Sequence, residues 1–262
     1  MTLPLIEKYR ASRFSEIKGQ EMAVHEIKTF FNNFPRKRAL ILNGPVGTGK
    51  TSMTIALANE YNLELFELNA SDLRNRMKLN EILKPASTQQ SLFKKGKIIL
   101  MDEADGITTS DNGGLPELLV LISRTGFPII ITANDIWQRK FSLLRQRCQI
   151  VNLKELKEPV LVEIINEILK KENKNLKKET INLIAKNAKG DVRSALNDLQ
   201  TAISLGEDIL LSELSEREKQ ITIFETLKKL FQNPINSEIF NIFDNTNMEL
   251  DEIALWVEEN IP

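Results

Sequence analysis

A glycine-rich segment that ends in lysine and threonine has the spacing of a phosphate-binding loop. It runs Gly44-Pro45-Val46-Gly47-Thr48-Gly49-Lys50-Thr51 and fits the pattern G-x-x-x-x-G-K-[ST]. Its glycines let backbone N–H groups turn toward phosphate oxygens, where the start of the next helix adds a favourable potential. Lys50 can reach β- and γ-phosphates, and the Thr51 hydroxyl can bind Mg²⁺. The alternative is a glycine-rich turn that binds nothing, which the apolar run before it and the helical pattern after it disfavour.

An acidic pair follows a second apolar run. Ile98-Ile99-Leu100-Met101 leads into Asp102 and Glu103, and a buried parallel strand delivers such residues to the sheet edge where ligands bind. We expect Asp102 to hold Mg²⁺ and Glu103 to polarise the attacking water in phosphoryl transfer. The next two residues complete the letters D-E-A-D. A helicase of that kind needs a second nucleotide-binding lobe, however, and the remaining chain offers only helices.

Two further polar residues are candidates for the same site. Asn134 ends the run Ile129–Ala133, and between the phosphate loop and the acidic strand it could bind the attacking water or the γ-phosphate; alternatively, it only caps the turn before Asp135. Arg193 lies in the first turn of a predicted helix, where the helix dipole disfavours positive charge. A phosphate would compensate for this, although pairing with Asp191 is the alternative.

Short apolar runs alternating with helical patterns must position these residues. The predicted strands cover residues 39–42, 63–68, 97–101, 128–132 and 148–153, and helices are predicted over 20–34 and 50–61. This alternation predicts an α/β domain with a parallel sheet and crossover helices over residues 1–153.

The pattern changes to helices alone after residue 153. Helices are predicted over 159–171, 178–188 and 191–205, with a stop at 187–190 and Asp191 as the next N-cap. We therefore predict a small helical domain over 154–211. Residues 212–262 form a helical, acidic segment that is short for an independent core.

Composition excludes several classes of protein. The chain has 262 residues, 42% of them hydrophobic and 27% charged, with one cysteine and one histidine. This excludes wholesale disorder, a disulfide framework and a cysteine-rich zinc site. No apolar run is long enough to span a membrane, and we expect a soluble, cytoplasmic protein. Residues 1–200 carry 31 Lys+Arg against 23 Asp+Glu, and residues 201–262 carry 4 against 13. The basic part is compatible with polyanion contact or with ordinary solvated surface.

Together these motifs resemble the AAA+ ATPases, and within them the clamp-loader subunits. The segment Pro4–Arg10, followed by Ile17-Lys18-Gly19-Gln20, is similar to the family's adenine-side motif, although Ala11 replaces its usual proline. The resemblance implies adenine-side contacts from Ile6, Tyr9, Arg10 and Ile17. It also matches Asn134 to the sensor 1 position and Arg193 to the sensor 2 position.

Four stretches are similar to archaeal large subunits of replication factor C. They are Asn69–Arg74, Asp102–Ile107, Thr132–Asp135 and Gly190–Ala195. The resemblance implies an ATP- and Mg²⁺-dependent clamp-loader subunit with a helical lid and the start of a collar. Its expected partners are the small subunits, the sliding clamp and primer-template DNA, bound through its backbone without sequence preference. The candidate DNA-contact residues are Arg74, Arg76, Lys78, Lys94 and Lys95.

Two departures from that family pattern leave alternatives open. Family members continue past this chain's last residues, so we expect the collar either to be incomplete here or to be completed by a second polypeptide. Arg147-Cys148 is similar to the arginine finger of small subunits, but Gln146 stands where they have serine, which favours an ordinary surface arginine. Rival functions are another AAA+ initiator or DNA-remodelling ATPase, a scaffold subunit that binds ATP without hydrolysing it, and a small-molecule kinase.

Overall fold

The computed structural model describes residues 3–69, 94–107, 114–212 and 214, which belong to two compact units, Met1–Leu199 and Gln200–Pro262. In the second unit, residues 200–212 and 214 are described, and they contain the end of helix α9 (Val192–Leu205) and a helical segment over residues 207–212. Most of the predicted 212–262 segment lies outside the described residues, as do Arg74, Arg76 and Lys78. The predicted domain limits after residues 153 and 211 stay predictions.

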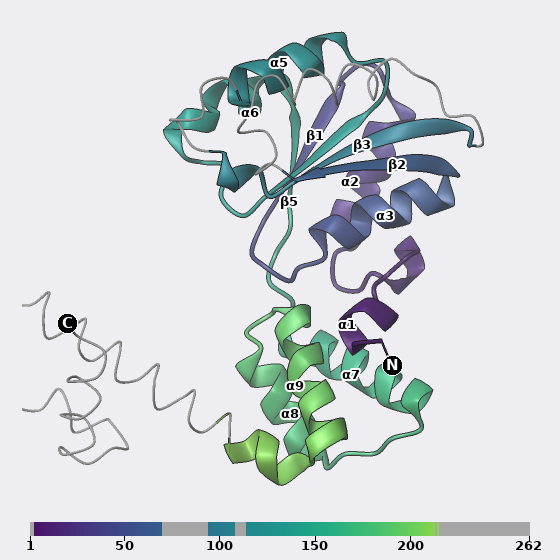
Figure 1. Cartoon of the computed structure of the whole chain (residues 1–262), viewed down its shortest axis with the longest axis vertical. Helices are drawn as coiled ribbons and strands as arrows, with labels where there is room; N and C mark the ends of the chain where they lie inside the picture. Colours follow the sequence, from purple (N-terminus) through teal and green to yellow (C-terminus); the bar gives the residue numbers. More distant parts are fainter. Residues whose placement is uncertain (1–2, 70–93, 108–113, 213, 215–262) are drawn as a thin grey trace, which may run out of the picture. The chain divides into compact units, whose positions relative to one another are not determined.

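Five parallel strands form one sheet in the order β2-β3-β4-β1-β5 (Figure 1). They are β1 (Ala39–Asn43), β2 (Leu63–Asn69), β3 (Gly96–Asp102), β4 (Ile129–Ala133) and β5 (Gln149–Asn152). Each strand begins and ends within one residue of a predicted run, which confirms the parallel-sheet prediction. Because β4 lies between β1 and β3, the residues that follow these three strands meet at one edge of the sheet.

The sheet is buried on both faces because helices cover each of them (Figure 1). Helices α2 (Glu21–Asn32) and α3 (Lys50–Glu60) pack on one face, and α5 (Gly114–Arg124) and α6 (Ser142–Arg147) lie on the other. Successive β3 residues alternate between the two cores: Ile98 packs with Ile27 and Phe30 of α2, whereas Ile99 packs with Leu118 of α5. Burial on both faces explains why the three central strands, β3, β4 and β1, contain continuous apolar stretches.

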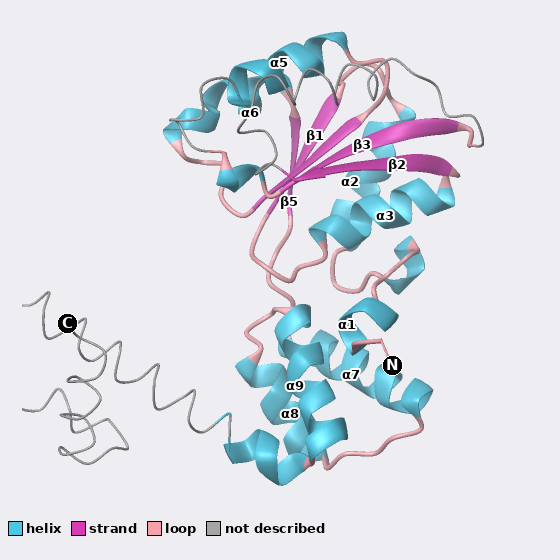
Figure 2. Ribbon diagram, in the orientation of Figure 1, coloured by secondary structure: helices cyan, strands magenta, loops and turns pink. Residues whose placement is uncertain are grey.

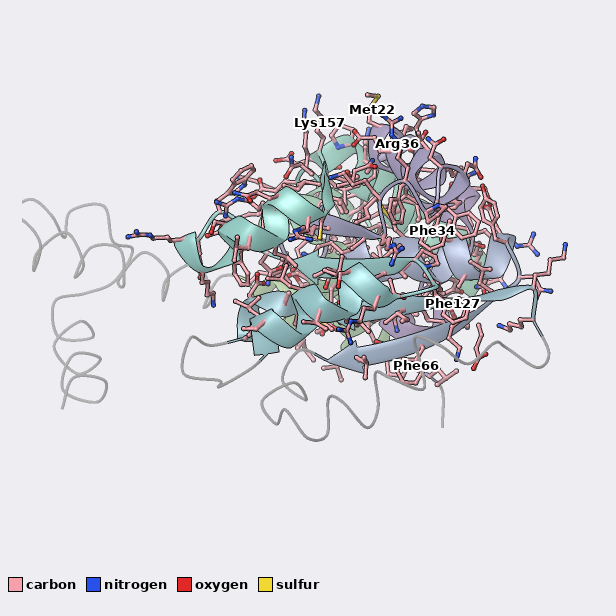
Figure 3. All side chains as sticks on the ribbon, turned by 90° about the horizontal axis from the view of Figure 1, so that it is seen from above. Met22, Phe34, Arg36, Phe66, Phe127 and Lys157 are labelled. Carbon is pink, nitrogen blue, oxygen red and sulfur yellow. The ribbon has the colours of Figure 1, made fainter. Side chains whose placement is uncertain are left out.

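The opposite, amino-terminal end of β3 contains a buried cation. Lys97 is 7% exposed, and its ammonium lies 6.0 Å from the centre of the Phe66 ring and 5.8 Å from that of Phe127. Both rings are labelled in Figure 3 on the same side of the molecule. Contact with two aromatic faces is a favourable environment for an ammonium group.

Only helices follow the sheet in the described part of the chain, which contains no strand after Asn152 (Figure 2). They include α7 (Glu158–Glu172), α8 (Lys178–Asn187) and α9, before the helical segment over residues 207–212. The predicted stop after α8 is confirmed: Lys189 and Gly190 have positive φ angles of 47° and 87°. Asp191 is the predicted cap of α9, since its Oδ1 accepts a hydrogen bond of 3.1 Å from the Ser194 N–H.

The amino-terminal segment contacts both parts of the first unit. It contains α1 (Leu5–Lys8) and a short 3-10 helix, Phe14–Glu16. The Phe14 N–H donates to Glu60 of α3 at 2.9 Å, whereas Lys18 pairs with Glu163 and Glu167 of α7. The segment therefore connects the sheet domain to the helical part.

Candidate functional site: a nucleotide-binding cavity

The phosphate loop joins the buried strand β1 to helix α3, as the sequence predicts. The Gly44 N–H donates to the carbonyl of Ala133 at 3.1 Å, which fixes the loop to the end of β4. At the other end, Gly49 is the N-cap of α3 with φ 95°, in the left-handed region that glycine adopts readily. Lys50 and Thr51 thus occupy the first turn of α3, where the helix dipole favours an anion.

Lys50 uses its ammonium group to connect the loop with Asn134. Its Nζ donates hydrogen bonds of 2.8 Å to the carbonyls of Gly44 and Pro45 and to Asn134 Oδ1. Burial lowers the pKa of Lys50, an effect opposed by the nearby carboxylates of Asp105 and Asp102. A half-buried ammonium group of this kind gains strongly from an anionic partner.

Gly47 brings the phosphate loop into contact with the first residues of α9. Its φ is 69°, and a Cβ placed there would lie 1.7 Å from Asp191 Oδ1. The Val192 N–H also donates to the Gly47 carbonyl at 3.2 Å. Only glycine allows this close approach, so the loop and the start of α9 determine each other's position.

The acidic end of β3 lies beside the loop. Thr51 Oγ1 donates to the Asp102 carboxylate at 3.2 Å, and Thr132 Oγ1 also donates to Asp102. Glu103 is exposed and has the left-handed angles φ 56° and ψ 48°. Such a backbone is uncommon for a residue with a side chain and is found at functional sites.

Asp105 belongs to this arrangement, although no sequence motif indicates a role for it. Its carboxylate accepts the Asn134 N–H at 2.6 Å and the Asp135 N–H at 3.3 Å. These bonds hold the turn after β4, and the Asn134 side chain meets Lys50. The only available signal was its position three residues after Asp102, which does not reveal a partner 29 residues away.

The predicted adenine-side residues Ile6, Tyr9, Arg10 and Ile17 all line the same cavity. The Tyr9 hydroxyl donates to Glu172 at the end of α7 at 2.5 Å, and burial raises the pKa of Tyr9. The hydrogen bond from Lys8, 2.6 Å long, lowers the pKa of Glu172. Sequence reasoning gave no indication of Glu172, which lies 163 residues from Tyr9.

Arg193 also lines the cavity and is exposed. Asp191, its predicted alternative partner, instead accepts a bond from the Ser194 N–H. Within the described part of the chain, no ion pair joins Arg193 to an acidic side chain. The arginine is therefore available to an anion in the cavity.

One cavity of about 950 Å³ brings these groups together. The predicted residues that line it are Ile6, Tyr9, Arg10, Ile17, Val46, Gly47, Thr48, Gly49, Lys50, Thr51, Asp102, Glu103, Asn134 and Arg193. Gly44 and Pro45 do not line it and contribute the carbonyls that hold Lys50. The cavity is in the size range of small-molecule sites.

The oxygen groups beside Thr51 suit one magnesium ion better than a protein-only metal cage. In the described residues, no group of three or more His, Cys, Asp or Glu side chains could hold a metal. Mg²⁺ commonly takes one or two carboxylates together with phosphate oxygens and water. The Thr51 hydroxyl and the Asp102 carboxylate therefore fit a nucleotide-bound ion.

Arg147 and the candidate DNA-contact residues Lys94 and Lys95 lie outside this cavity. Arg147 is exposed at the end of α6, and its neighbour Cys148 is buried, which raises the pKa of the thiol to about 12. Lys94 and Lys95 are exposed before β3.

None of the helices among the described residues is long and apolar enough to cross a membrane.

Residues 40–156 match the model of the ATPase family associated with various cellular activities (AAA). The match begins in β1 and ends just before α7, so it covers the phosphate loop, Asp102, Glu103 and Asn134. The sheet domain is thus an AAA ATPase domain.

Curated relatives extend the similarity to nearly the whole chain. It is 38% identical to the replication factor C large subunit of Nanoarchaeum equitans, over 99% of this chain and 62% of that relative. Identity to the large subunit of Pyrococcus abyssi is 40%, over 99% of this chain and 54% of the relative. For the large subunit of Pyrobaculum aerophilum it is 36%, over the full chain and 68% of the relative. The chain therefore spans about half to two thirds of these proteins.

Solved structures agree on the fold. The RuvB Holliday junction branch migration motor of Thermotoga maritima has a TM-score of 0.66 at 18% identity, over 95% of this chain and 85% of that one. Domain III of the replication initiation protein DnaA from the same organism has a TM-score of 0.59 at 19% identity, over 75% of this chain and 92% of that one. At such low identity these two neighbours show only a shared fold.

Proposed function

The chain belongs to the family of replication factor C large subunits, and from this premise we propose that it binds and hydrolyses ATP as a clamp-loader subunit. The observation that carries the proposal is the single cavity lined by the phosphate loop, Asp102, Glu103, Asn134 and Arg193. These groups come from the loop after β1, the ends of β3 and β4, and the first turn of α9. They supply both contacts to phosphate and a means of positioning water.

We propose that Lys50 and the backbone N–H groups at the start of α3 bind the β- and γ-phosphates. Thr51 and Asp102 would hold Mg²⁺, which neutralises charge on the phosphate oxygens. The 3.2 Å contacts between the Thr51 hydroxyl and the Asp102 carboxylate support this pairing, because they put both groups within reach of one ion.

Glu103 is the proposed group that polarises the attacking water, and Asn134 would orient that water or the γ-phosphate. Arg193 would contact the γ-phosphate, so that ATP favours a closer position of α9 over the loop. This assignment is supported by the cavity that the three residues share and by the lack of an acidic ion-pair partner for Arg193 in the described structure.

The adenine ring is proposed to lie between the amino-terminal segment and the helical part. Ile6 and Ile17 of the amino-terminal segment line the cavity, as do Ile168 of α7 and Leu196 of α9. Apolar walls suit the faces of a purine. Tyr9, whose hydroxyl donates to Glu172, also lines this cavity.

We propose further that the chain acts in the cytoplasm with replication factor C small subunits, the sliding clamp and primer-template DNA. A neighbouring subunit would contribute an arginine to hydrolysis, and DNA would be bound through its phosphates without sequence preference. The support is family membership and the basic balance of residues 1–200, with 31 Lys+Arg against 23 Asp+Glu.

The test is ATP hydrolysis by the full chain mixed with small subunits, the clamp and primed DNA. Wild type should hydrolyse ATP, with stimulation by clamp and DNA together. Glu103→Gln should bind ATP with unchanged affinity and lose hydrolysis, because an amide cannot polarise water as a carboxylate does.

A wild-type rate that equals the Glu103→Gln rate would refute the ATPase proposal and favour a scaffold subunit that binds ATP without hydrolysing it. An ATPase rate that the clamp and DNA do not stimulate would indicate an ATPase whose function is not clamp loading.

A further inference from the structure

We propose that Thr132 is a positioning residue that fixes Glu103 for ATP hydrolysis. This inference rests on the proposed function and adds a residue to its machinery. Thr132 is the fourth residue of β4, is 1% exposed, and lies directly beside the acidic end of β3.

The Thr132 hydroxyl makes two hydrogen bonds with different residues of the acidic pair. Its Oγ1 donates to Asp102 Oδ1 and accepts the Glu103 N–H at 3.0 Å. A hydroxyl can donate one hydrogen bond and accept another, so one buried oxygen defines the position of both acids. Among small side chains, only threonine and serine carry a hydroxyl that can donate one hydrogen bond and accept another.

The Glu103 backbone requires such a restraint because its left-handed conformation is unfavourable. For a residue with a Cβ, φ 56° persists only when surrounding contacts hold it there. The bond to Thr132 is the contact that reaches the Glu103 N–H directly. An extended or helical backbone at this position would turn the Glu103 side chain in another direction.

A second hydrogen bond in the opposite sense completes the connection between the two strand ends. Asp105, two residues after Glu103, accepts the N–H of Asn134, two residues after Thr132, at 2.6 Å. The two bonds therefore close a ring through the chain segments 103–105 and 132–134. This ring sets Glu103 and Asn134 relative to each other, and Asn134 Oδ1 contacts Lys50 at 2.8 Å.

The ring explains why a threonine is buried at the end of an otherwise apolar strand. Its three preceding strand residues, Ile129, Ile130 and Ile131, are all fully buried, and valine would fill the same volume. A buried hydroxyl is costly unless it is hydrogen-bonded, and here both of its bonds lead to the proposed catalytic loop.

The test compares Thr132→Val, which keeps the shape and removes the hydroxyl, with Thr132→Ser, which keeps the hydroxyl. In the full chain with small subunits, clamp and DNA at saturating Mg²⁺, Thr132→Val should lower kcat about 10- to 100-fold. A displacement of about 1 Å in a catalytic group costs on this order. The KM for ATP should stay within about threefold, since the phosphate loop and Lys50 are unchanged. Thr132→Ser should stay within about threefold of wild type in both constants.

Amide hydrogen exchange of the same variants provides a readout without turnover. The Glu103 amide should exchange at least about tenfold faster in Thr132→Val than in wild type or Thr132→Ser, because its acceptor is gone. Core amides of β1 should be unchanged, which excludes general loosening.

The possible outcomes distinguish the positioning role of Thr132 from the proposed ATPase function. A wild type that hydrolyses ATP together with a Thr132→Val variant of equal kcat would overturn the positioning role alone, as would unchanged exchange at Glu103. A kcat loss that Thr132→Ser shares would also overturn it, because the hydroxyl would then not be the cause. A wild type without hydrolysis would instead refute the proposed ATPase function.

Discussion

Replacing Lys50 with methionine should weaken ATP binding by roughly five- to seventyfold. In the structure the ammonium already has three oxygen partners at 2.8 Å, so phosphate must displace at least one of them. Attraction between unit charges about 4 Å apart is about 4 kcal/mol at an effective dielectric constant of 20. Giving up one hydrogen bond from a charged donor costs about 1.5–3 kcal/mol. The difference, about 1–2.5 kcal/mol, is the expected loss of binding free energy.

The same substitution should also change how the stability of the protein without nucleotide depends on pH. Burial lowers the pKa of Lys50, so the charged form is less favourable in the folded than in the unfolded chain. Folded-state stability therefore rises with pH between the lowered pKa and the ordinary value of 10.5, and at neutral pH the charge is a cost. Lys50→Met should remove this rise of stability with pH, and the increase in unfolding temperature that ATP gives to wild type should shrink.

Calorimetry and thermal unfolding, each with and without ATP and Mg²⁺, measure these effects. The control is Lys28→Met, which removes a partly exposed lysine that pairs with Glu60 at 3.4 Å and does not line the cavity. The control should bind ATP as wild type does. An affinity of Lys50→Met within threefold of wild type would refute the assignment of Lys50 to phosphate binding.

Three further substitutions or measurements test other parts of the site. Arg193→Ala should weaken ATP by about tenfold to hundredfold through the loss of a charge-assisted bond worth about 1.5–3 kcal/mol, but leave ADP unchanged in calorimetry; equal losses would make Arg193 a structural residue. Gly47→Ala should lower the midpoint of thermal unfolding and weaken ATP, because its Cβ would meet Asp191 at 1.7 Å; a wild-type midpoint and affinity would contradict this packing. Cys148, whose pKa burial raises to about 12, should resist thiol reagents at pH 8 until the protein unfolds. Since its folded pKa is above the unfolded one, the thiol should also reduce stability as pH rises above about 9, and Cys148→Ala should remove that alkaline slope in unfolding experiments.

The centre of the sheet could be predicted from sequence because β1, β3 and β4 each contain a short, continuous apolar run. Ile129, Ile130 and Ile131 are fully buried in β4, and a strand covered on both faces leaves no polar alternation to interpret. The acidic pair was predictable for the same reason: a buried run that ends in Asp102 and Glu103 places both at the ligand-binding edge. Asn134 followed from the expectation that its strand lies between the other two, which the order β3-β4-β1 confirms.

Side-chain bonds between strand ends could not be predicted in this way. Thr132 and Asp105 lie next to residues with recognisable roles but have no motif of their own. Their hydrogen-bond partners depend on the register in which Ile99 of β3 pairs with Ile129 of β4. A shift of one residue would exchange the two faces of the strand. The bond from Tyr9 to Glu172 joins residues 163 positions apart in the sequence, so only the tertiary structure reveals it. The left-handed backbone of Glu103 likewise has no signal in its residue type.

The phosphate loop is joined directly to the first residues of α9. Gly47 touches Asp191 through a contact that only glycine permits, and its carbonyl accepts the Val192 N–H. Arg193 is the next residue, on the first turn of α9, so a phosphate bound to the loop lies close to a helix whose first peptide is already fixed to that loop. Under the proposed function, attraction of Arg193 to the γ-phosphate would therefore act on α9 one residue from its bond to the phosphate loop.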